Sequence, residues 1–172
     1  TKQDISMTIL LILSLIALAY IYFGYPIVLF ALSIFRRSNV RKGAQKPSVT
    51  ILIAAYNEEK CIEATIQNKL ELSYPADRVN IVVISDGSND DTDEIVRKCQ
   101  SSRVRLIRQE PRAGKTSALN KGVLEAKGEI LVISDANSIY RLDALSHLVE
   151  NFHDEKVGYV TGKMIYVNPD GS

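Results

Sequence analysis

The fold of this chain is decided by residues 129–138, which read Glu129-Ile130-Leu131-Val132-Ile133-Ser134-Asp135-Ala136-Asn137-Ser138. The apolar run from Ile130 to Ile133 has no polar residue at alternate positions, a pattern typical of a parallel strand that is covered on both faces. Polar residues that follow such a strand emerge where the strand leaves the core. We therefore expect Asp135 and Asn137 to lie at the carboxyl end of a buried strand.

Two other predicted strands end in the same way. Residues 49–55 form an apolar run that leads into Tyr56-Asn57-Glu58-Glu59, and the run that ends at Ile84 leads into Ser85-Asp86-Gly87-Ser88. In an open α/β sheet, ligands bind in the crevice outside the carboxyl ends of the strands. Three polar loops at these strand ends therefore predict a ligand-binding site.

Predicted strands and helices alternate from residue 48 onward. Besides the strands at 49–55 and 130–134, we expect strands at 79–84 and 104–108, a β segment at 158–167, and helices at 59–72, 92–100, 115–126 and 142–152. Gly128 follows the third of these helices and is expected to end it as a C′ glycine. Such alternation is typical of an α/β domain with a mostly parallel sheet, which we assign to residues 48–172.

The N-terminal segment predicts a membrane anchor, which we assign to residues 1–36. No charged residue occurs from Ile5 to Phe35, and about 20 apolar residues already span a bilayer. The alternatives are a buried helix of a soluble protein and a cleaved signal peptide, but several aromatic residues near position 22 fit a cleavage site poorly. Pro26 is expected to kink the helix or to mark where a shallower segment begins.

A basic linker, residues 37–47, follows the predicted anchor. The end of the anchor and this linker together carry five basic residues and no acidic one: Arg36, Arg37, Arg41, Lys42 and Lys46. By the positive-inside rule this side of the membrane is cytoplasmic, and the run suits contact with anionic headgroups. The whole chain has a net charge of only +1, so the rest of the domain is net acidic. This charge argues against nucleic-acid binding.

The three loops contain candidate ligand-binding side chains. Asp86 stands at a strand end before a glycine and could accept a hydrogen bond from a ligand N–H, such as the imide of a pyrimidine. Asp135 and Asn137 place two oxygen-bearing side chains at alternate positions, which could reach a ribose or a hard divalent cation, Mg²⁺ or Mn²⁺. The alternative for Asp135 is a helix cap. Residues 112–117 end like a P-loop, but Gln109 stands where that motif requires its first glycine.

Taken together, these motifs resemble the inverting family-two glycosyltransferases. The matching residues are Val49-Thr50-Ile51-Leu52-Ile53-Ala54-Ala55-Tyr56-Asn57-Glu58-Glu59, Val83-Ile84-Ser85-Asp86-Gly87-Ser88, Gly114-Lys115 with Ala118-Leu119-Asn120, and Ala126-Lys127-Gly128-Glu129 leading to Asp135-Ala136-Asn137. The resemblance implies a GT-A fold and transfer of a sugar, of the hexosyl or N-acetylhexosaminyl type, from a UDP-sugar to an acceptor hydroxyl of a glycan or lipid in cell-surface or extracellular polysaccharide synthesis.

The resemblance also implies roles for individual residues. Tyr56 and Glu58 would flank the base, Asp86 would accept from uracil, and Lys115 would lie near the nucleotide. Asp135 with Asn137 would serve the ribose and the metal. The implied donor-binding residues are Ala55, Tyr56, Glu58, Asp86, Lys115, Asp135 and Ala136, and the implied metal ligands are Asp135 and Asn137.

The sequence departs from the family pattern at three positions. Ala54 replaces a proline, Ser85 replaces the first acid of an Asp-Asp pair, and Asn137 replaces the second acid of the DxD motif. The family's catalytic base lies in a second half of the domain, so we expect it beyond Ser172 and expect this chain alone to be inactive. The competing hypothesis is a nucleotide-sugar-binding or scaffold module without turnover. We also expect residues 158–167 to stay partly unburied and to promote self-association or binding of a partner chain.

Overall fold

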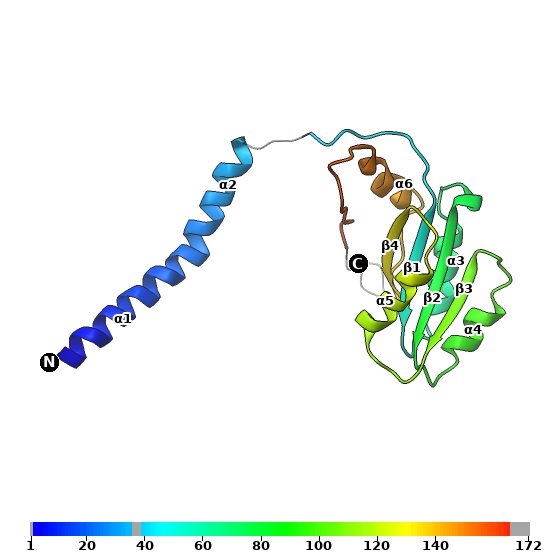
Figure 1. Cartoon of the computed structure of the whole chain (residues 1–172), viewed down its shortest axis with the longest axis horizontal. Coiled ribbons are helices and arrows are strands. Elements are labelled where there is room, and N and C mark those ends of the chain that lie inside the picture. The colour runs from blue at the N-terminus through cyan, green and yellow to red at the C-terminus, as the bar shows by residue number, and fades with distance from the viewer. Residues whose placement is uncertain (1, 36–38, 166–172) are drawn as a thin grey trace. The chain divides into compact units, whose positions relative to one another are not determined.

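A computed structural model describes residues 2–35 and 39–165 of the chain (Figure 1). The structure contains two compact units, one that ends at Asn39 and one that begins at Val40. The first unit is helical, and the second is an α/β domain.

The first unit is one continuous helical run. It comprises α1 (Lys2–Ala19), a π-helical turn η1 (Tyr20–Gly24) and α2 (Tyr25–Phe35). Among the described residues, Asp4–Ile34 is the one helix that is long and apolar enough to cross a membrane. Proline lacks the N–H that would bond four residues back, and a π-helical turn is one way in which a helix accommodates such a loss. The chain therefore stays helical through Pro26, and no break separates two segments there.

The second unit is built on a four-stranded sheet in which every pair of neighbouring strands is parallel. The strand order is β3 (Val104–Gln109), β2 (Val79–Asp86), β1 (Val49–Ala55) and β4 (Ile130–Asp135). Each predicted strand in this set is confirmed to within two residues. Because the strands are parallel, their carboxyl ends lie at one edge of the sheet.

Helices cover both faces of the sheet. Helices α3 (Ile62–Leu70), α4 (Thr92–Lys98) and α6 (Ala144–Val149) share the larger core, and α5 (Lys115–Glu125) covers β1 and β2 from the other side (Figure 1). Two short 3₁₀ turns complete the unit, η2 (Ala76–Arg78) and η3 (Glu150–His153). The predicted alternation of strands and helices is therefore confirmed, and so is the α/β class.

The expectation that β4 is covered on both faces is wrong for the described part of the chain. Leu131 and Ile133 point to the α5 side of the sheet and are 41% and 59% exposed. Helix α5 packs on β1 and β2 but does not extend over β4. An unbroken apolar run therefore indicates here a strand whose second face has no cover among residues 2–35 and 39–165.

The predicted β segment at 158–167 is also wrong over residues 158–165, which have no regular secondary structure. Residues 166 and 167 lie outside the described residues. A strand needs a pairing partner for its backbone, and no described strand pairs with this segment. Met164 and Ile165 are 62% and 70% exposed, as expected. Association through this segment stays a prediction.

Gly128 does not end the third helix as a C′ glycine. Helix α5 ends at Glu125, and its C-cap residue Ala126 is already extended, with φ −75° and ψ 139°. Gly128 instead lies against β1, where its N–H donates to the Thr50 hydroxyl oxygen (2.9 Å). The role of this glycine is close backbone packing at the start of β4.

The described part of the basic linker packs on the domain. The Gly43 N–H donates to the Glu150 carbonyl oxygen (3.0 Å), and Lys42 forms an ion pair with the Glu150 carboxylate (2.7 Å). The Lys46 ammonium donates to the Ser146 hydroxyl oxygen (2.8 Å). Arg36 and Arg37 lie outside the described residues. Contact with anionic lipid therefore stays a prediction, and part of the positive charge is already paired within the domain.

Candidate functional site

A cavity of about 330 Å³ lies outside the carboxyl ends of β1, β2 and β4. The register explains why these ends meet, because Ala54 of β1 pairs with both Ile84 of β2 and Asp135 of β4. The cavity brings together all the sequence-predicted site residues and adds Ala54 and Arg112. Its lining residues are Ala54, Ala55, Tyr56, Glu58, Asp86, Arg112, Lys115, Asp135, Ala136 and Asn137.

Asp86 is a buried carboxylate that organises the loop after β3. Its Oδ1 accepts hydrogen bonds from Gln109 Nε2 (2.6 Å) and the Ala113 N–H (2.8 Å), and its Oδ2 accepts one from the Gly114 N–H (2.8 Å). Burial alone would raise the pKa of Asp86, but these hydrogen bonds and the nearby Arg112 outweigh it and hold the pKa below its ordinary value. Asp86 is therefore ionised at neutral pH.

Two glycines adopt backbone conformations that the turn after β2 and the loop after β3 require. Gly114 has φ +91° and Gly87 has φ +69°, conformations that residues with a Cβ rarely adopt. A Cβ on Gly87 would also lie 3.2 Å from the Arg112 Cβ. Glycine at position 87 therefore lets the turn after β2 and the loop after β3 approach each other closely without strain.

Arg112 lies over one face of the Tyr56 ring, which the family resemblance assigns to the nucleotide base. Its guanidinium carbon lies 3.6 Å from the centre of the Tyr56 ring, and its Nε lies 3.8 Å from Asp86 Oδ2. A guanidinium over an aromatic face is a favourable cation–π contact. The sequence pattern placed Arg112 in a segment that ends like a P-loop and did not assign it to the site. A cation in a loop beside predicted anion-binding residues was the available signal.

Asp135 and Lys115 form an ion pair across the cavity. The Asp135 carboxylate is half-exposed, as is the Lys115 ammonium, and Asn137 lines the same cavity two residues further on. Among the described residues no three His, Cys, Asp or Glu side chains gather as a metal-binding group. Asp135 and Asn137 fit a hard cation as two oxygen ligands, provided that other oxygens, such as those of a diphosphate, complete its coordination.

Residues 89–92, which follow β2, hold the loop after β1 in place. The Asn57 and Asn89 side chains are joined by a 2.7 Å hydrogen bond, and the Thr92 hydroxyl oxygen accepts from the Glu58 N–H (2.8 Å). Asp90 accepts from the Glu59 N–H (3.1 Å) and from the Thr92 N–H (3.0 Å). Asp90 therefore satisfies an N–H at the start of α4 and also fixes the backbone that carries Tyr56 and Glu58.

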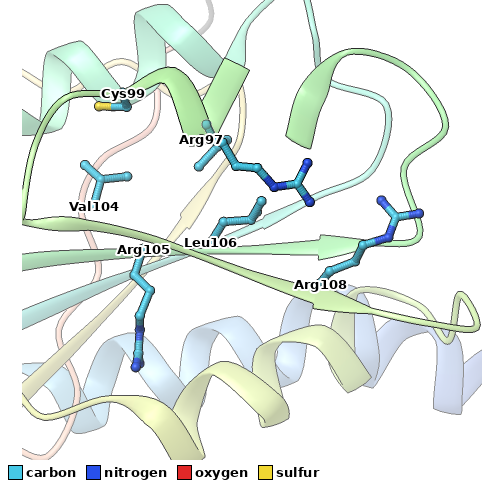
Figure 2. Close-up of a pocket in the computed structure, with 7 residues that line it drawn as sticks. Arg97, Cys99, Val104, Arg105, Leu106 and Arg108 are labelled. Atoms are coloured by element: carbon cyan, nitrogen blue, oxygen red, sulfur yellow. The ribbon is translucent and has the colours of Figure 1, made fainter. Parts of the chain in front are cut away.

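A second hollow, of about 380 Å³, lies between α4 and β3 and is not the ligand site. Figure 2 shows Arg97 and Arg108 on one side of β3 and Arg105 pointing to the other. Each arginine is already paired with a carboxylate: Arg97 and Arg108 with Asp93, and Arg105 with Glu125. The arginine charges of this hollow are therefore balanced by carboxylates of the domain.

Comparison with known proteins identifies relatives of this α/β domain. The family model described as glycosyl transferase family 2 matches residues 50–172. Poly-beta-1,6-N-acetyl-D-glucosamine synthase of Staphylococcus aureus is 40% identical over 117 residues, which are 66% of this chain and 28% of that protein. The probable glycosyltransferase YdaM of Bacillus subtilis is 38% identical over 128 residues, 71% of this chain and 30% of that protein. The chain thus spans less than a third of either relative.

Solved structures confirm the expected GT-A fold. The mannosyltransferase PcManGT from Pyrobaculum calidifontis, solved in complex with GDP-Man and Mn²⁺, has a TM-score of 0.73 and 32% identity, and the match covers 83% of this chain and 44% of that one. S. aureus TarS residues 1–349 in complex with UDP-GlcNAc has a TM-score of 0.58 and 24% identity over 63% of this chain and 31% of that one. The TarS similarity is evidence for the fold alone.

Proposed function

Because the chain belongs to glycosyl transferase family 2, we propose that it is the donor-binding part of a membrane-anchored inverting glycosyltransferase. The donor is a UDP-sugar, bound with Mg²⁺ or Mn²⁺, and the acceptor is a hydroxyl of a glycan or lipid. The S. aureus relatives are named for the polymer poly-beta-1,6-N-acetyl-D-glucosamine, which supports a role in surface polysaccharide synthesis. The apolar helix Asp4–Ile34 supports the membrane anchor, with the domain on the cytoplasmic side.

The observation that carries this proposal is the chemistry of the 330 Å³ cavity. Tyr56 offers an aromatic face for a base, and Asp86 offers a carboxylate for a base N–H. Lys115 and Arg112 offer positive charge for a diphosphate, and Asp135 with Asn137 offers oxygen ligands for a cation. A nucleoside diphosphate with a bound divalent cation has each of the complementary groups.

The hydrogen bonds of Asp86 support uracil over guanine. A carboxylate has about four acceptor positions, and the bonds from Gln109, Ala113 and Gly114 use three of them. The remaining position, on Oδ2, suits the single imide N–H of uracil. Guanine presents two adjacent N–H donors and would need both carboxylate oxygens.

In this proposal the chain's residues bind and orient the donor. Asp86 and Tyr56 would fix the base, and Lys115 would contact the diphosphate. Asp135 and Asn137 would hold the cation, which would stabilise the negative charge that develops on the leaving diphosphate.

We expect the chain in detergent micelles to bind UDP more tightly than GDP, and Asp86→Ala to weaken UDP binding by roughly 1.5 to 3 kcal/mol, the range for a hydrogen bond to a charged group. Isothermal titration calorimetry with the two nucleotides measures both effects. The control is Asp154→Ala, which also removes a carboxylate that accepts a backbone N–H within a loop, that of Lys156, but does not line the cavity. Equal affinity for UDP and GDP would contradict the choice of uridine.

We expect Asn137→Asp to tighten Mn²⁺ binding in the presence of UDP by about tenfold, because ligand charge strongly tunes cation affinity. Electron paramagnetic resonance of free Mn²⁺ gives the affinity. Asn80→Asp is the matched control, since it adds the same charge at the exposed, opposite end of β2. An unchanged affinity in Asn137→Asp would place residue 137 outside the coordination sphere.

A further inference from the structure

Three polar side chains on one face of α3 bind the loop that carries Asp135 and Asn137. Thr65, Asn68 and Lys69 are three and four residues apart, so they share one face of the helix. Each donates a hydrogen bond to a backbone carbonyl oxygen of the loop after β4: Thr65 Oγ1 to Ala136 (2.6 Å), Lys69 Nζ to Ser138 (2.5 Å) and Asn68 Nδ2 to Tyr140 (2.9 Å). Asn68 Oδ1 also accepts from the Tyr140 N–H (2.8 Å).

These side chains are inside the domain, where polar groups are costly unless they are paired. Thr65 and Lys69 are both 0% exposed. The Lys69 ammonium also donates to Asn68 Oδ1 (3.1 Å) and lies 3.7 Å from the centre of the Tyr140 ring. Burial lowers the pKa of Lys69 to about 8. An apolar residue would fill this position without that cost, so the lysine serves to bind the loop rather than to pack the core.

The loop after β4 has no regular secondary structure over residues 136–143. Its backbone hydrogen bonds lie at its two ends, from the Ser138 N–H to the Asp135 carbonyl oxygen (3.3 Å) and from the Ser73 N–H to the Leu142 carbonyl oxygen (2.8 Å). Asp135 is fixed by its pairing with Ala54 at the end of β4, but Asn137 lies beyond the sheet. Thr65 holds Ala136, the residue between the two.

We propose that Thr65, Asn68 and Lys69 are positioning residues that set the distance between Asp135 and Asn137, and thereby the cation affinity of the donor site. This inference rests on the proposed function. The hydrogen bonds of Thr65, Asn68 and Lys69 run to the loop after β4, whereas those that hold Asp86 come from residues 109–114. Loss of these hydrogen bonds should therefore weaken cation binding without weakening metal-free nucleotide binding.

The test compares Thr65→Val, which keeps the shape and removes the hydroxyl, with Thr65→Ser, which restores the hydroxyl. We expect Thr65→Val to weaken Mn²⁺ binding at saturating UDP by about tenfold, in the range for residues that orient metal ligands, and to leave UDP affinity in EDTA within about twofold. Thr65→Ser should retain wild-type Mn²⁺ affinity. Asn68→Ala, at a less buried position, should reproduce the loss of Thr65→Val.

The matched control is Thr50→Val. Thr50 is also buried, and its hydroxyl also has one backbone partner, the Gly128 N–H, so it reports the effect of lost stability alone. An equal loss of Mn²⁺ affinity in Thr50→Val and Thr65→Val would overturn the proposal, as would unchanged affinity in Thr65→Val.

Hydrogen exchange of the ligand-free chain separates this inference from the proposed function. We expect the amides of residues 138–140 to exchange at least about tenfold faster in Thr65→Val and Asn68→Ala, because the opening free energy of a loop falls when its hydrogen bonds are removed. A wild-type chain that binds neither UDP nor Mn²⁺ would contradict the proposed function. Unchanged exchange at 138–140 would contradict the positioning role, whatever the chain binds.

Discussion

Replacing Asp135 with alanine should reduce the Mn²⁺-dependent affinity of this chain for UDP by about 100-fold or more, because a charged ligand that holds the cation is lost. Asp135 is the one acidic side chain of the Asp135-Ala136-Asn137 motif, and its register with Ala54 places it at the edge of the cavity. Asn137 and the diphosphate would then hold the cation without protein charge. Calorimetry with UDP in the presence of Mn²⁺ or EDTA measures the effect.

Because Asp135 is paired with Lys115, its replacement should weaken UDP binding in the presence of Mn²⁺ but not in EDTA. Without Asp135, the Lys115 ammonium has lost its carboxylate partner and can contact the diphosphate, so UDP affinity in EDTA should stay equal to wild type or rise. Glu94→Ala is the matched control, since Glu94 also pairs with a lysine, Lys98 (2.8 Å), but on the surface of α4. A parallel loss of affinity with and without Mn²⁺ would show that Asp135 acts on the nucleotide and not through a cation.

The positions of the site residues could be predicted because they follow from the local pattern. Apolar runs gave the strands, and the parallel order brings strand ends to one edge of the sheet. Tyr56 and Asp135 come directly after predicted strands and Asp86 comes two residues after one, so no knowledge of long-range packing was needed to place them together.

The contacts within the site could not be predicted in this way. Arg112 lies over Tyr56 because three donors from residues 109–114 converge on Asp86, and no periodicity reports such a convergence. The polar face of α3 is a second example. Polar residues at helical spacing normally indicate the solvent face, whereas Thr65 and Lys69 are buried because the carbonyls of a distant loop need donors.

Gly128 shows how one residue type can indicate two different structures. A glycine shortly after a predicted helix is typical of a C-cap, and the same residue is also required where two backbones come close. Local sequence does not distinguish the two. The structure has the second, at the point where β4 begins beside β1.

Gly128→Ala should therefore destabilise the α/β domain by about 3 kcal/mol, the upper end of the range for overpacked sites. An added Cβ would lie 2.5 Å from the Thr50 nitrogen and 2.7 Å from the Val49 carbonyl carbon. Both are backbone atoms of a strand that is paired on both sides, so neither can move without breaking sheet hydrogen bonds. Urea unfolding of the full chain in detergent, followed by circular dichroism, measures the change.

Gly158→Ala is the matched control for this substitution. A Cβ at position 158 would meet no atom within 4 Å, and alanine reduces the conformational entropy of the unfolded chain, so this variant should be unchanged or more stable by about 0.4 to 1 kcal/mol. The two variants carry the same substitution, but only the one at position 128 would place a Cβ against β1. Equal unfolding midpoints for Gly128→Ala and Gly158→Ala would mean that β4 does not start against Thr50, and the register between β1 and β4 would have to be revised.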